Sequence, residues 1–312
     1  MTPTVYVTGG NGFLGRSVVA GLVASGVRVV SGDLGFPADP VEGVEYEIAD
    51  VTDAAALTEQ FTRHRVEAVI HLASIVNPGA ATTPEQEFRV DVVGSRTVFD
   101  ACLATGVRRV VVSSSGAAYG YHADNPEWLV ETDPLRGNDD FPYSRHKRLV
   151  EEMLAELRVT NPELEQVVFR IGTILGPTVR NHITALWDGR RIMRIAGSDS
   201  PFVFVWVDDV VAAMVRAVTG GPAGIYNVAG DGRMTVREIA AAMGKPTFVI
   251  PAAVLAVALA VGHALRLTPH GPAQVKFLRY RPVLSNESLK KHFGFTPTRT
   301  TREAFAEYLR HR

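Results

Sequence analysis

The stretch Thr4-Val-Tyr-Val-Thr-Gly-Gly-Asn-Gly-Phe-Leu-Gly15 decides the fold, because a short apolar strand runs directly into a glycine-spaced loop. Gly9, Gly12 and Gly15 are three residues apart, and residues 16–23 follow with the apolar spacing of a helix. Glycines let the backbone approach a pyrophosphate closely, and the free N–H groups of a helix N-terminus favour negative charge. The pattern predicts a phosphate-binding turn between the first strand and the first helix.

An acidic residue at the end of the second predicted strand strengthens this interpretation. Residues 27–33 read as a strand that ends on Asp33, 24 residues after Gly9. A carboxylate at this spacing accepts hydrogen bonds from ribose hydroxyls and repels a 2′-phosphate, and no arginine stands beside it. We therefore expect NAD as the cofactor rather than NADP. The alternative to a dinucleotide-binding site is that the glycine loop is a purely structural turn.

Composition limits the class of protein. The 312 residues carry a formal net charge of −1, which gives no electrostatic case for nucleic acid binding. The single cysteine, Cys102, excludes an internal disulfide and fits a reducing compartment. The sequence opens into a strand rather than a basic and apolar leader, so we expect a cytoplasmic protein. No metal-ligand spacing of His, Cys, Asp or Glu is present, so we expect no metal site.

One apolar segment tests the expectation of a soluble chain. The uncharged run 248–262 is shorter than the roughly 20 residues that cross a bilayer, and His263 and Arg266 follow it. We interpret it as a buried or interface helix that starts near Pro251. A monotopic membrane contact and a cover over an apolar substrate are the alternatives.

Strands and helices alternate through the first two-thirds of the chain. Expected strands are 4–8, 27–33, 44–48, 67–73, 108–114 and 166–171, and expected helices are 13–25, 53–64, 85–105 and 143–158. This order predicts an α/β fold with a Rossmann-type, doubly wound parallel sheet. We expect residues 1–177 to form the dinucleotide-binding domain and residues 178–312 mainly a smaller C-terminal α/β substrate lobe, with some elements returning to the core.

Two capping signals define the end of that lobe. Ser285 is expected to cap a helix at 286–293 that Gly294 stops. Thr300 and Glu303 have the spacing of a capping box for a helix at 301–310.

A phenol, an ammonium and a hydroxyl carry the predicted chemistry. Tyr143 and Lys147 are four residues apart after Pro142, so they share one face of a helix, where the ammonium favours a phenolate. Such a phenol suits general acid/base catalysis. Ser115 lies at the end of a central strand, where side chains point into the ligand crevice of open α/β sheets. Its alternative role is to cap a turn.

Motifs along the whole chain carry a family resemblance. They are Thr8–Gly15, Asp33, Asp50-Val51, His71-Leu72-Ala73-Ser74, Ser113–Gly120, Tyr143 with Lys147, Arg170 with Gly176-Pro177, Trp206-Val207-Asp208-Asp209-Val210, and Ser285-Asn286-Glu287 with Phe293-Gly294-Phe295-Thr296-Pro297. Together they resemble an extended short-chain dehydrogenase/reductase of the NAD-dependent epimerase/dehydratase family.

The resemblance implies a role for each matching position. The cofactor would contact Gly9, Gly12, Phe13, Leu14, Gly15, Asp33, Asp50, Val51, Leu72, Ala73, Ser74, Tyr143 and Lys147. Asp33 would bind the adenosine ribose and Asp50 the adenine amino group. Ser115 would be the catalytic hydroxyl, Tyr143 the acid/base, and Lys147 the ligand of the nicotinamide ribose. Asp208-Asp209 would fix the C-terminal lobe to the core.

Several positions depart from relatives that act on nucleotide sugars. Thr173 replaces an Asn, Ser200-Pro201-Phe202 replaces an Arg-Asp-Phe, Trp206 replaces a His, and Asp91 replaces a helix Asn. The changes remove polar anchors and add apolar side chains. Arginines that could still clamp a diphosphate are Arg180, Arg190, Arg191, Arg194 and Arg281. Candidate substrate residues are Thr173, Asn181, His182 and Trp206, with His122, Trp128 and Trp187 as further pocket candidates.

These observations predict an NAD(P)-dependent oxidoreductase that transfers a hydride between the nicotinamide and a secondary alcohol or ketone. The preferred substrate is a relatively apolar, hydroxysteroid-like or other hydroxy/keto compound. The alternatives are a nucleotide-sugar 4-epimerase or dehydratase and a non-catalytic dinucleotide-binding protein. The resemblance implies a homodimer through the helices at 85–105 and 143–158.

Overall fold

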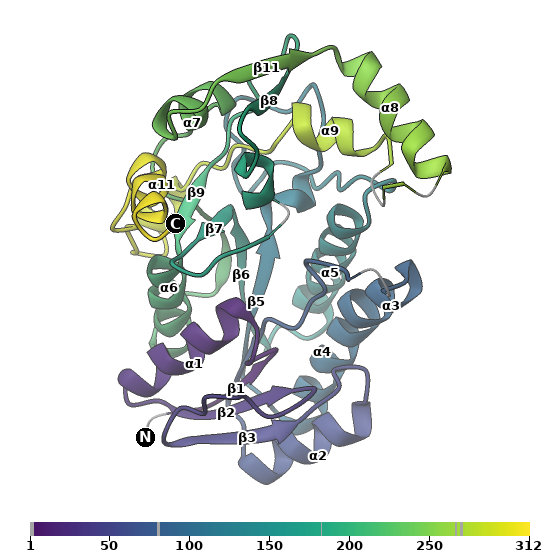
Figure 1. Ribbon diagram of the computed structural model, residues 1–312. Coiled ribbons are helices and arrows are strands. Elements are labelled where there is room, and N and C mark those ends of the chain that lie inside the picture. The colour runs from purple at the N-terminus through teal and green to yellow at the C-terminus, as the bar shows by residue number, and fades with distance from the viewer. Residues whose placement is uncertain (1–2, 80–81, 182, 266, 269–270) are drawn as a thin grey trace.

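The computed structural model describes residues 3–79, 82–181, 183–265, 267–268 and 271–312. Among these residues, seven parallel strands form one sheet in the order β10-β6-β5-β4-β1-β2-β3 (Figure 1). Its strands are β1 (Thr4–Thr8), β2 (Arg28–Asp33), β3 (Val44–Ile48), β4 (Ala68–His71), β5 (Arg109–Ser115), β6 (Glu165–Ile171) and β10 (Gly224–Val228). The predicted α/β fold with a Rossmann-type parallel sheet is confirmed.

The central strands are apolar on both sides because helices cover both faces of the sheet. Along β1, Val5 and Val7 pack into the core of one face and Tyr6 into the core of the other. The first core is closed by α1 (Phe13–Ala24) and α6 (Val207–Thr219), which contact each other. The second is closed by α2 (Ala54–His64), α4 (Gly94–Thr105) and α5 (Pro142–Thr160). Crossovers on both faces make the sheet doubly wound.

The helix expected at 85–105 is divided into three segments. It begins as α3 (Pro84–Phe88), which Thr83 and Gln86 cap reciprocally, passes through a π-helical turn η1 (Arg89–Val93), and continues as α4. The π-turn places Asp91 in the interior of the protein. A π-turn inside a helix is often found at a functional site.

Residues after Pro177 build the upper part of the molecule and also return to the sheet. β10 pairs with β6 at the edge of the sheet, and α6 covers it (Figure 1). The other strands form two small parallel pairs: β7 (Thr173–Leu175) with β9 (Phe204–Trp206), and β8 (Ile192–Ile195) with β11 (Thr247–Ile250). The remaining helices are α7 (Val236–Ala242), α8 (Ala252–Ala264), α9 (Gln274–Arg279), α10 (Glu287–Lys291) and α11 (Thr301–Arg310), with 3₁₀ turns η2 (Gly116–Tyr119) and η3 (Thr184–Trp187).

One of the two terminal capping predictions is confirmed and one is wrong. Thr300 and Glu303 form the reciprocal capping box at the start of α11. Ser285 does not cap α10: the capping position is Asn286, whose side-chain amide donates instead to the Ala229 carbonyl and to Asp231. Asn286 is thus used to join α10 to the loop after β10.

The apolar segment 248–262 forms β11 and α8. The expected helix does begin after Pro251, but the expectation that it is buried is wrong. No residue of α8 is buried, and Val254, Val257 and Val261 are each more than half exposed. In the described ranges, no helix is long and apolar enough to cross a membrane. α8 is therefore an apolar helix that lies on the surface.

Candidate active site

In the glycine loop that follows β1, the glycines bring backbone segments into close contact where a side chain would not fit. Gly9 takes a φ of 70°, and a Cβ there would lie 2.8 Å from the Ala73 nitrogen. A Cβ on Gly15 would lie 2.8 Å from the Gly10 carbonyl carbon. α1 begins immediately after Gly12, with no side-chain cap on its first N–H groups. These features match the predicted phosphate-binding turn.

Asp33 is held at the end of β2, beside the glycine loop. One carboxylate oxygen accepts from the Asn11 N–H at 2.8 Å, and the other accepts from the Leu34 N–H at 2.7 Å. These bonds fix the carboxylate in place, and each oxygen retains a further lone pair for a ribose hydroxyl. Asp50 is fixed similarly, with Oδ1 accepting from the N–H and hydroxyl of Thr52.

The end of β4 presents a polar atom that has no partner in the described structure. The hydroxyl of Thr8 accepts from the N–H groups of Leu72 and Ala73 and thereby ties this segment to β1. The Ser74 Oγ that follows is buried and makes no hydrogen bond within the described protein. An orphaned buried hydroxyl at the carboxyl edge of the sheet fits a bound group that supplies the missing partner.

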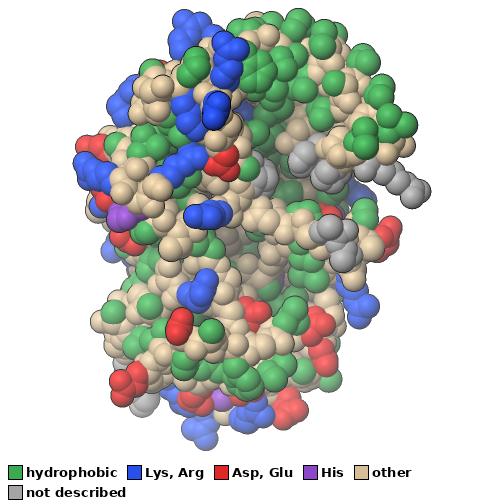
Figure 2. Space-filling model, in the orientation of Figure 1, with side chains coloured by type: hydrophobic (Ala, Val, Ile, Leu, Met, Phe, Trp, Pro, Cys, Tyr) green, Lys and Arg blue, Asp and Glu red, His purple; other side chains and the backbone are tan. Residues whose placement is uncertain are grey.

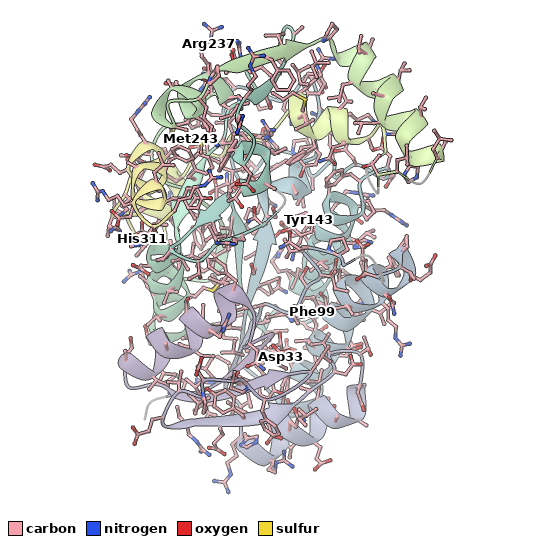
Figure 3. All side chains as sticks on the ribbon, in the orientation of Figure 1. Asp33, Phe99, Tyr143, Arg237, Met243 and His311 are labelled. Atoms are coloured by element: carbon pink, nitrogen blue, oxygen red, sulfur yellow. The ribbon has the colours of Figure 1, made fainter. Side chains whose placement is uncertain are left out.

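The predicted catalytic residues converge on the carboxyl end of β5. Ser115 ends β5, and its Oγ accepts from the Ala117 N–H at 3.1 Å. Tyr143 and Lys147 lie on α5, with the Lys147 ammonium 5.6 Å from the centre of the Tyr143 ring. The ammonium also donates to the Ser113 carbonyl at 2.9 Å, which fixes it against β5. In Figure 3, Tyr143 lies near the middle of the molecule and Asp33 lower, among the sheet elements.

A buried ion pair holds α5 against the sheet. Arg170 on β6 donates to both carboxylate oxygens of Glu151 on α5, at 2.8–3.1 Å, and to the Tyr119 hydroxyl. Burial alone would lower the pKa of Arg170, but Glu151 outweighs it and raises the pKa above its ordinary value. Burial raises the pKa of Tyr119 to about 12, so this phenol is neutral. The clamp positions the helix that carries Tyr143 and Lys147.

A chain of hydrogen bonds that the sequence did not reveal connects the glycine strand with α5. His71 lies between the hydroxyls of Thr8 and Ser95, at 2.8 and 2.9 Å, and Ser95 donates to the Asp91 carbonyl. Asp91 accepts from the Ile75 N–H and pairs with His146 Nδ1 on α5 at 3.0 Å. The Asp that replaces the family's Asn thus has a buried histidine partner one residue before Lys147.

Burial and the nearby Lys147 lower the pKa of His71 to about 3. The ring is therefore neutral at physiological pH. Because Ser95 uses its proton toward Asp91, the network assigns the ring proton to Nε2 and leaves Nδ1 to accept from Thr8. The only sequence signal was the position of His71 at the end of a strand.

The predicted substrate residue Trp206 does not add apolar surface to the molecule. Trp206 is buried in the core of the C-terminal lobe, and its indole donates to Asp208. Phe202, Phe204 and Trp187 form an aromatic cluster in the same core. Trp206, Phe202 and Phe204 were expected to add apolar surface, and Trp187 to line a pocket, but all four side chains fill the lobe's interior.

The other substrate candidates have mixed placements. The Asn181 carboxamide accepts from the Ile183 and Thr184 N–H groups, so it serves the η3 turn. Thr173 is half-buried at the start of β7. His122 bonds to the Arg136 carbonyl, and Trp128 packs under Arg233. His182 lies outside the described residues.

Asp209 performs the anchoring role that the resemblance implied. Its Oδ1 accepts from the Thr298 N–H at 2.8 Å and so joins α6 to the segment before α11. Among the described residues, no group of three or more His, Cys, Asp or Glu side chains could hold a metal ion.

Of the five candidate arginines, Arg281 is partly buried and forms no ion pair with a carboxylate among the described residues. Arg180, Arg190 and Arg191 are exposed, and Arg194 pairs with Asp199. Arg281 donates to the carbonyl and hydroxyl of Ser200, at 2.9 and 2.8 Å, while its buried Nε makes no hydrogen bond within the described protein.

The surroundings of Arg281 contain aromatic rings and no compensating charge. The guanidinium lies 3.8 Å from the centre of the Phe202 ring and 5.0 Å from that of Phe277. No ion pair joins it to a carboxylate in the part of the chain that the structure describes, and burial lowers its pKa to about 9. Phe277 belongs to the same apolar cluster as Tyr143. The structure thus places an uncompensated cation next to the cluster that contains the predicted acid/base.

Comparison with known proteins agrees with this geometry. The model of the NAD dependent epimerase/dehydratase family matches residues 5–229, a span that ends just after β10. An uncharacterized protein of Mycobacterium bovis is 24% identical over 99% of this chain and 84% of its own length. A UDP-glucose 4-epimerase of Erwinia amylovora is 32% identical over 54% of this chain and 52% of its own length.

A solved structure shows the same similarity in three dimensions. The UDP-glucose 4-epimerase of Thermus thermophilus, in complex with NAD, is 26% identical, with a TM-score of 0.76 that covers 99% of this chain and 98% of that one.

Proposed function

Because the chain belongs to the NAD-dependent epimerase/dehydratase family, we propose that it is an enzyme that binds NAD and acts on a nucleotide sugar, as an epimerase or dehydratase. The single observation that carries the choice of substrate is Arg281, a partly buried cation without a carboxylate partner in the described chain. The family relatives named as UDP-glucose 4-epimerases support the same choice.

The residues of the site fit NAD. The glycines of the turn at Gly9–Gly15 leave room for a pyrophosphate, and Asp33 offers oxygens to the adenosine ribose. The orphaned Ser74 hydroxyl would find its partner on the bound cofactor. NAD, when bound, supplies a hydride acceptor and donor. The described cations do not include one that contacts Asp33, which favours NAD over NADP.

The chain's own residues move the proton and orient the sugar. The Tyr143 phenol oxygen would take the proton of a sugar hydroxyl as that carbon is oxidised, and return it in the reverse step. The Ser115 hydroxyl would hydrogen-bond the same oxygen and favour the carbonyl form. The Lys147 ammonium lies 5.6 Å from the centre of the Tyr143 ring, and its bond to the Ser113 carbonyl keeps it in place.

Arg281 would hold the anionic half of the substrate. A buried guanidinium costs free energy unless an anion or a carboxylate compensates it. A diphosphate supplies that anion and accepts the remaining N–H donors of a guanidinium. The aromatic rings of Phe202 and Phe277 lie against the guanidinium, at 3.8 and 5.0 Å from their centres, and favour the cation there.

The apolar hydroxy/keto substrate expected from the sequence loses most of its basis. It depended on Trp206, Phe202, Phe204 and the run 248–262 as apolar surface, and the three aromatic side chains are buried in the lobe core. The run 248–262 forms β11 and the surface helix α8. The relatives named by activity above are UDP-glucose 4-epimerases. The convergence of Ser115, Tyr143 and Lys147 at one strand end argues against a non-catalytic dinucleotide-binding protein.

The test uses the full chain with a panel of UDP- and dTDP-sugars. We expect NAD to copurify and turnover to occur without added cofactor, because an epimerase or dehydratase returns the hydride to its substrate. Arg281→Met, which keeps the apolar stem between the two rings, should raise KM about tenfold or more while the NAD content stays unchanged. Stoichiometric NADH consumption with a ketone, or an unchanged KM for every active sugar nucleotide in Arg281→Met, would contradict the proposal.

A homodimer through α4 and α5 belongs to the same proposal. Relatives of this type pair through the corresponding helices, as the family resemblance implies. Sedimentation velocity at micromolar protein concentration should show a species of twice the chain mass. A monomer under these conditions would exclude it.

A further inference from the structure

Helix α8 turns an apolar face toward solvent. Val254, Val257, Val261 and Leu265 are 53–65% exposed and recur at the three- and four-residue spacing of one helix face. No Asp, Glu, Lys or Arg occurs within α8. The preceding strand β11 adds Val249, which is 55% exposed. A contiguous apolar face of this kind marks an interaction surface rather than scattered exposed residues.

The opposite side of α8 packs toward the active site. Ala252 and Leu255 lie against the cluster that contains Tyr143 and Phe277, and α8 contacts α9. The helix is thus attached to the body of the protein by its inner side. Its outward face is left uncovered in the described structure.

A group of basic residues lies at the other end of the same rim. Arg190 and Arg191 precede β8, Lys245 precedes β11, and the two strands run parallel and in register from this end. Arg237 on α7 lies at the top of the molecule in Figure 3. The four-residue strand β11 spans about 13 Å between this basic group and α8.

The views show the two groups on one edge. Figure 1 places α7, β11 and α8 in a row along the top of the molecule. In Figure 2, Lys and Arg side chains gather at the upper left of that edge and hydrophobic side chains at the upper right.

Negative charge is missing from this rim. The sequence contains no Asp or Glu between Glu238 and Glu287. Nearby carboxylates are already paired: Asp188 with Arg312, Asp199 with Arg194, and Glu238 with Arg302. Arg190, Arg191 and Arg237 form no ion pair with another described residue. The rim therefore presents uncompensated positive charge beside an apolar helix.

We propose that this rim docks the enzyme on the surface of a lipid bilayer that carries anionic headgroups. α8 lies in the interface with its valine face among the acyl chains, and the basic group meets the headgroup charge. A helix of this length inserts without spanning, in keeping with the absence of a spanning helix among the described residues. Docking would bring the Tyr143 side of the lobe close to the bilayer surface.

A second copy of the chain fits the rim less well. In a two-fold dimer the same surface patch meets itself, so two basic groups would enter one interface without carboxylates to compensate them. A bilayer with anionic lipids supplies both the apolar medium and the negative charge. This complementarity decides between the two occupants.

Vesicle flotation with the full-length protein tests the proposal without reference to catalysis. The vesicles are phosphatidylcholine alone or a 7:3 mixture of phosphatidylcholine and phosphatidylglycerol, at low salt and at high salt. We expect binding to the anionic vesicles that high salt weakens. The double variant Val257→Asp/Val261→Asp should bind at least about tenfold more weakly, since it places charge in the inserted face.

The control variant is Ile48→Asp/Val159→Asp, which adds the same charge at two exposed sites, 58% and 82%, on other elements. It should float as the unaltered chain does, and thermal unfolding should confirm that both variants fold. If the unaltered chain stays unbound with anionic vesicles, or the α8 variant binds like the control, the proposal is wrong. If sedimentation shows a dimer that only the α8 variant dissociates, and no vesicle binding, the face is an interface between copies.

Discussion

Helices α5 and α8 show opposite relations between composition and burial. α5 is rich in charged residues, yet it buries Val150, Leu154 and Leu157 and even the charged Glu151. α8 consists almost entirely of Ala, Val and Leu, yet none of its residues is buried. The difference arises because α5 connects the neighbouring strands β5 and β6 and therefore packs across the face of the central sheet. α8 instead follows β11, a strand of the small two-stranded sheet at the rim. Topology, rather than apolarity, decided which helix entered the core.

The comparison also separates two kinds of function. α5 holds reacting groups in fixed positions through a buried ion pair and a buried histidine pair. α8 has a single polar side chain, His263, and offers mainly an apolar surface. Changes in α5 should therefore alter catalysis and folding, and changes in α8 should leave both nearly intact.

The largest effect is expected from Tyr143→Phe on α5. Loss of the phenol removes the group that exchanges the substrate proton, so kcat should fall by about 10²–10⁴-fold with bound NAD retained. Tyr46→Phe is the matched control, because its hydroxyl accepts from the Val41 N–H away from α5. Steady-state kinetics with the active sugar nucleotide measures both. Equal activity of the two variants would remove Tyr143 from the chemistry.

The next largest effect is expected from Arg170→Met. It leaves the buried Glu151 without its cation, which should lower the free energy of unfolding by about 3–5 kcal/mol. Arg310→Gln removes an exposed pair with Glu307 and should change it by less than about 1 kcal/mol. Urea unfolding followed by circular dichroism compares them. Similar midpoints would show that the clamp does not hold α5.

A direct comparison of the two helices comes from one truncation in each. Leu154→Ala on α5 should cost about 2–5 kcal/mol, since Leu154 is fully buried. Val257→Ala on α8 should change the free energy of unfolding by less than about 0.5 kcal/mol, because its side chain is 65% exposed. The same unfolding assay serves both. A large loss in Val257→Ala would mean that α8 is covered in solution.

The smallest effect concerns the network that ends on α5. The pKa of His71 falls to about 3 in the folded chain from an unfolded value near 6.5, so between these values the unfolded chain binds one more proton. Stability is therefore lost as pH falls below about 6.5. His71→Asn should reduce the slope of unfolding free energy against pH by about 1 kcal/mol per unit between pH 4 and 6. Identical slopes for both chains would show that His71 is protonated when folded.

Much of the fold followed from local patterns. Alternation of Val-rich strands with amphipathic helices predicted the order of the sheet elements from β1 to β6, because each helix and strand is visible within a window of its own length. The elements after Pro177 were less evident. β8, β9 and β11, like β7 just before Pro177, are only three or four residues long, too short for a period to show.

The residues of the candidate site also fall into those that local patterns predicted and those that they did not. Gly9, Asp33, Ser115, Tyr143 and Lys147 were found because glycine spacing, strand ends and the four-residue helix repeat are local features. The partners of Asp91 and the burial of Trp206 were not found from the sequence. Asp91 meets His146 across 55 positions of sequence, and only the crossing of η1 and α5 brings them together.

The sequence by itself determined the glycine turn and the doubly wound sheet and identified the residues proposed to carry the chemistry, since backbone conformation and side-chain period depend on near neighbours. Only the tertiary structure decided that Arg281 is a cation without a carboxylate, and that an apolar helix faces solvent. Ser200, the partner of Arg281, lies 81 residues away, and burial depends on which distant elements cover a surface. Charge compensation and exposure are properties of the whole packing, so no local pattern specifies them.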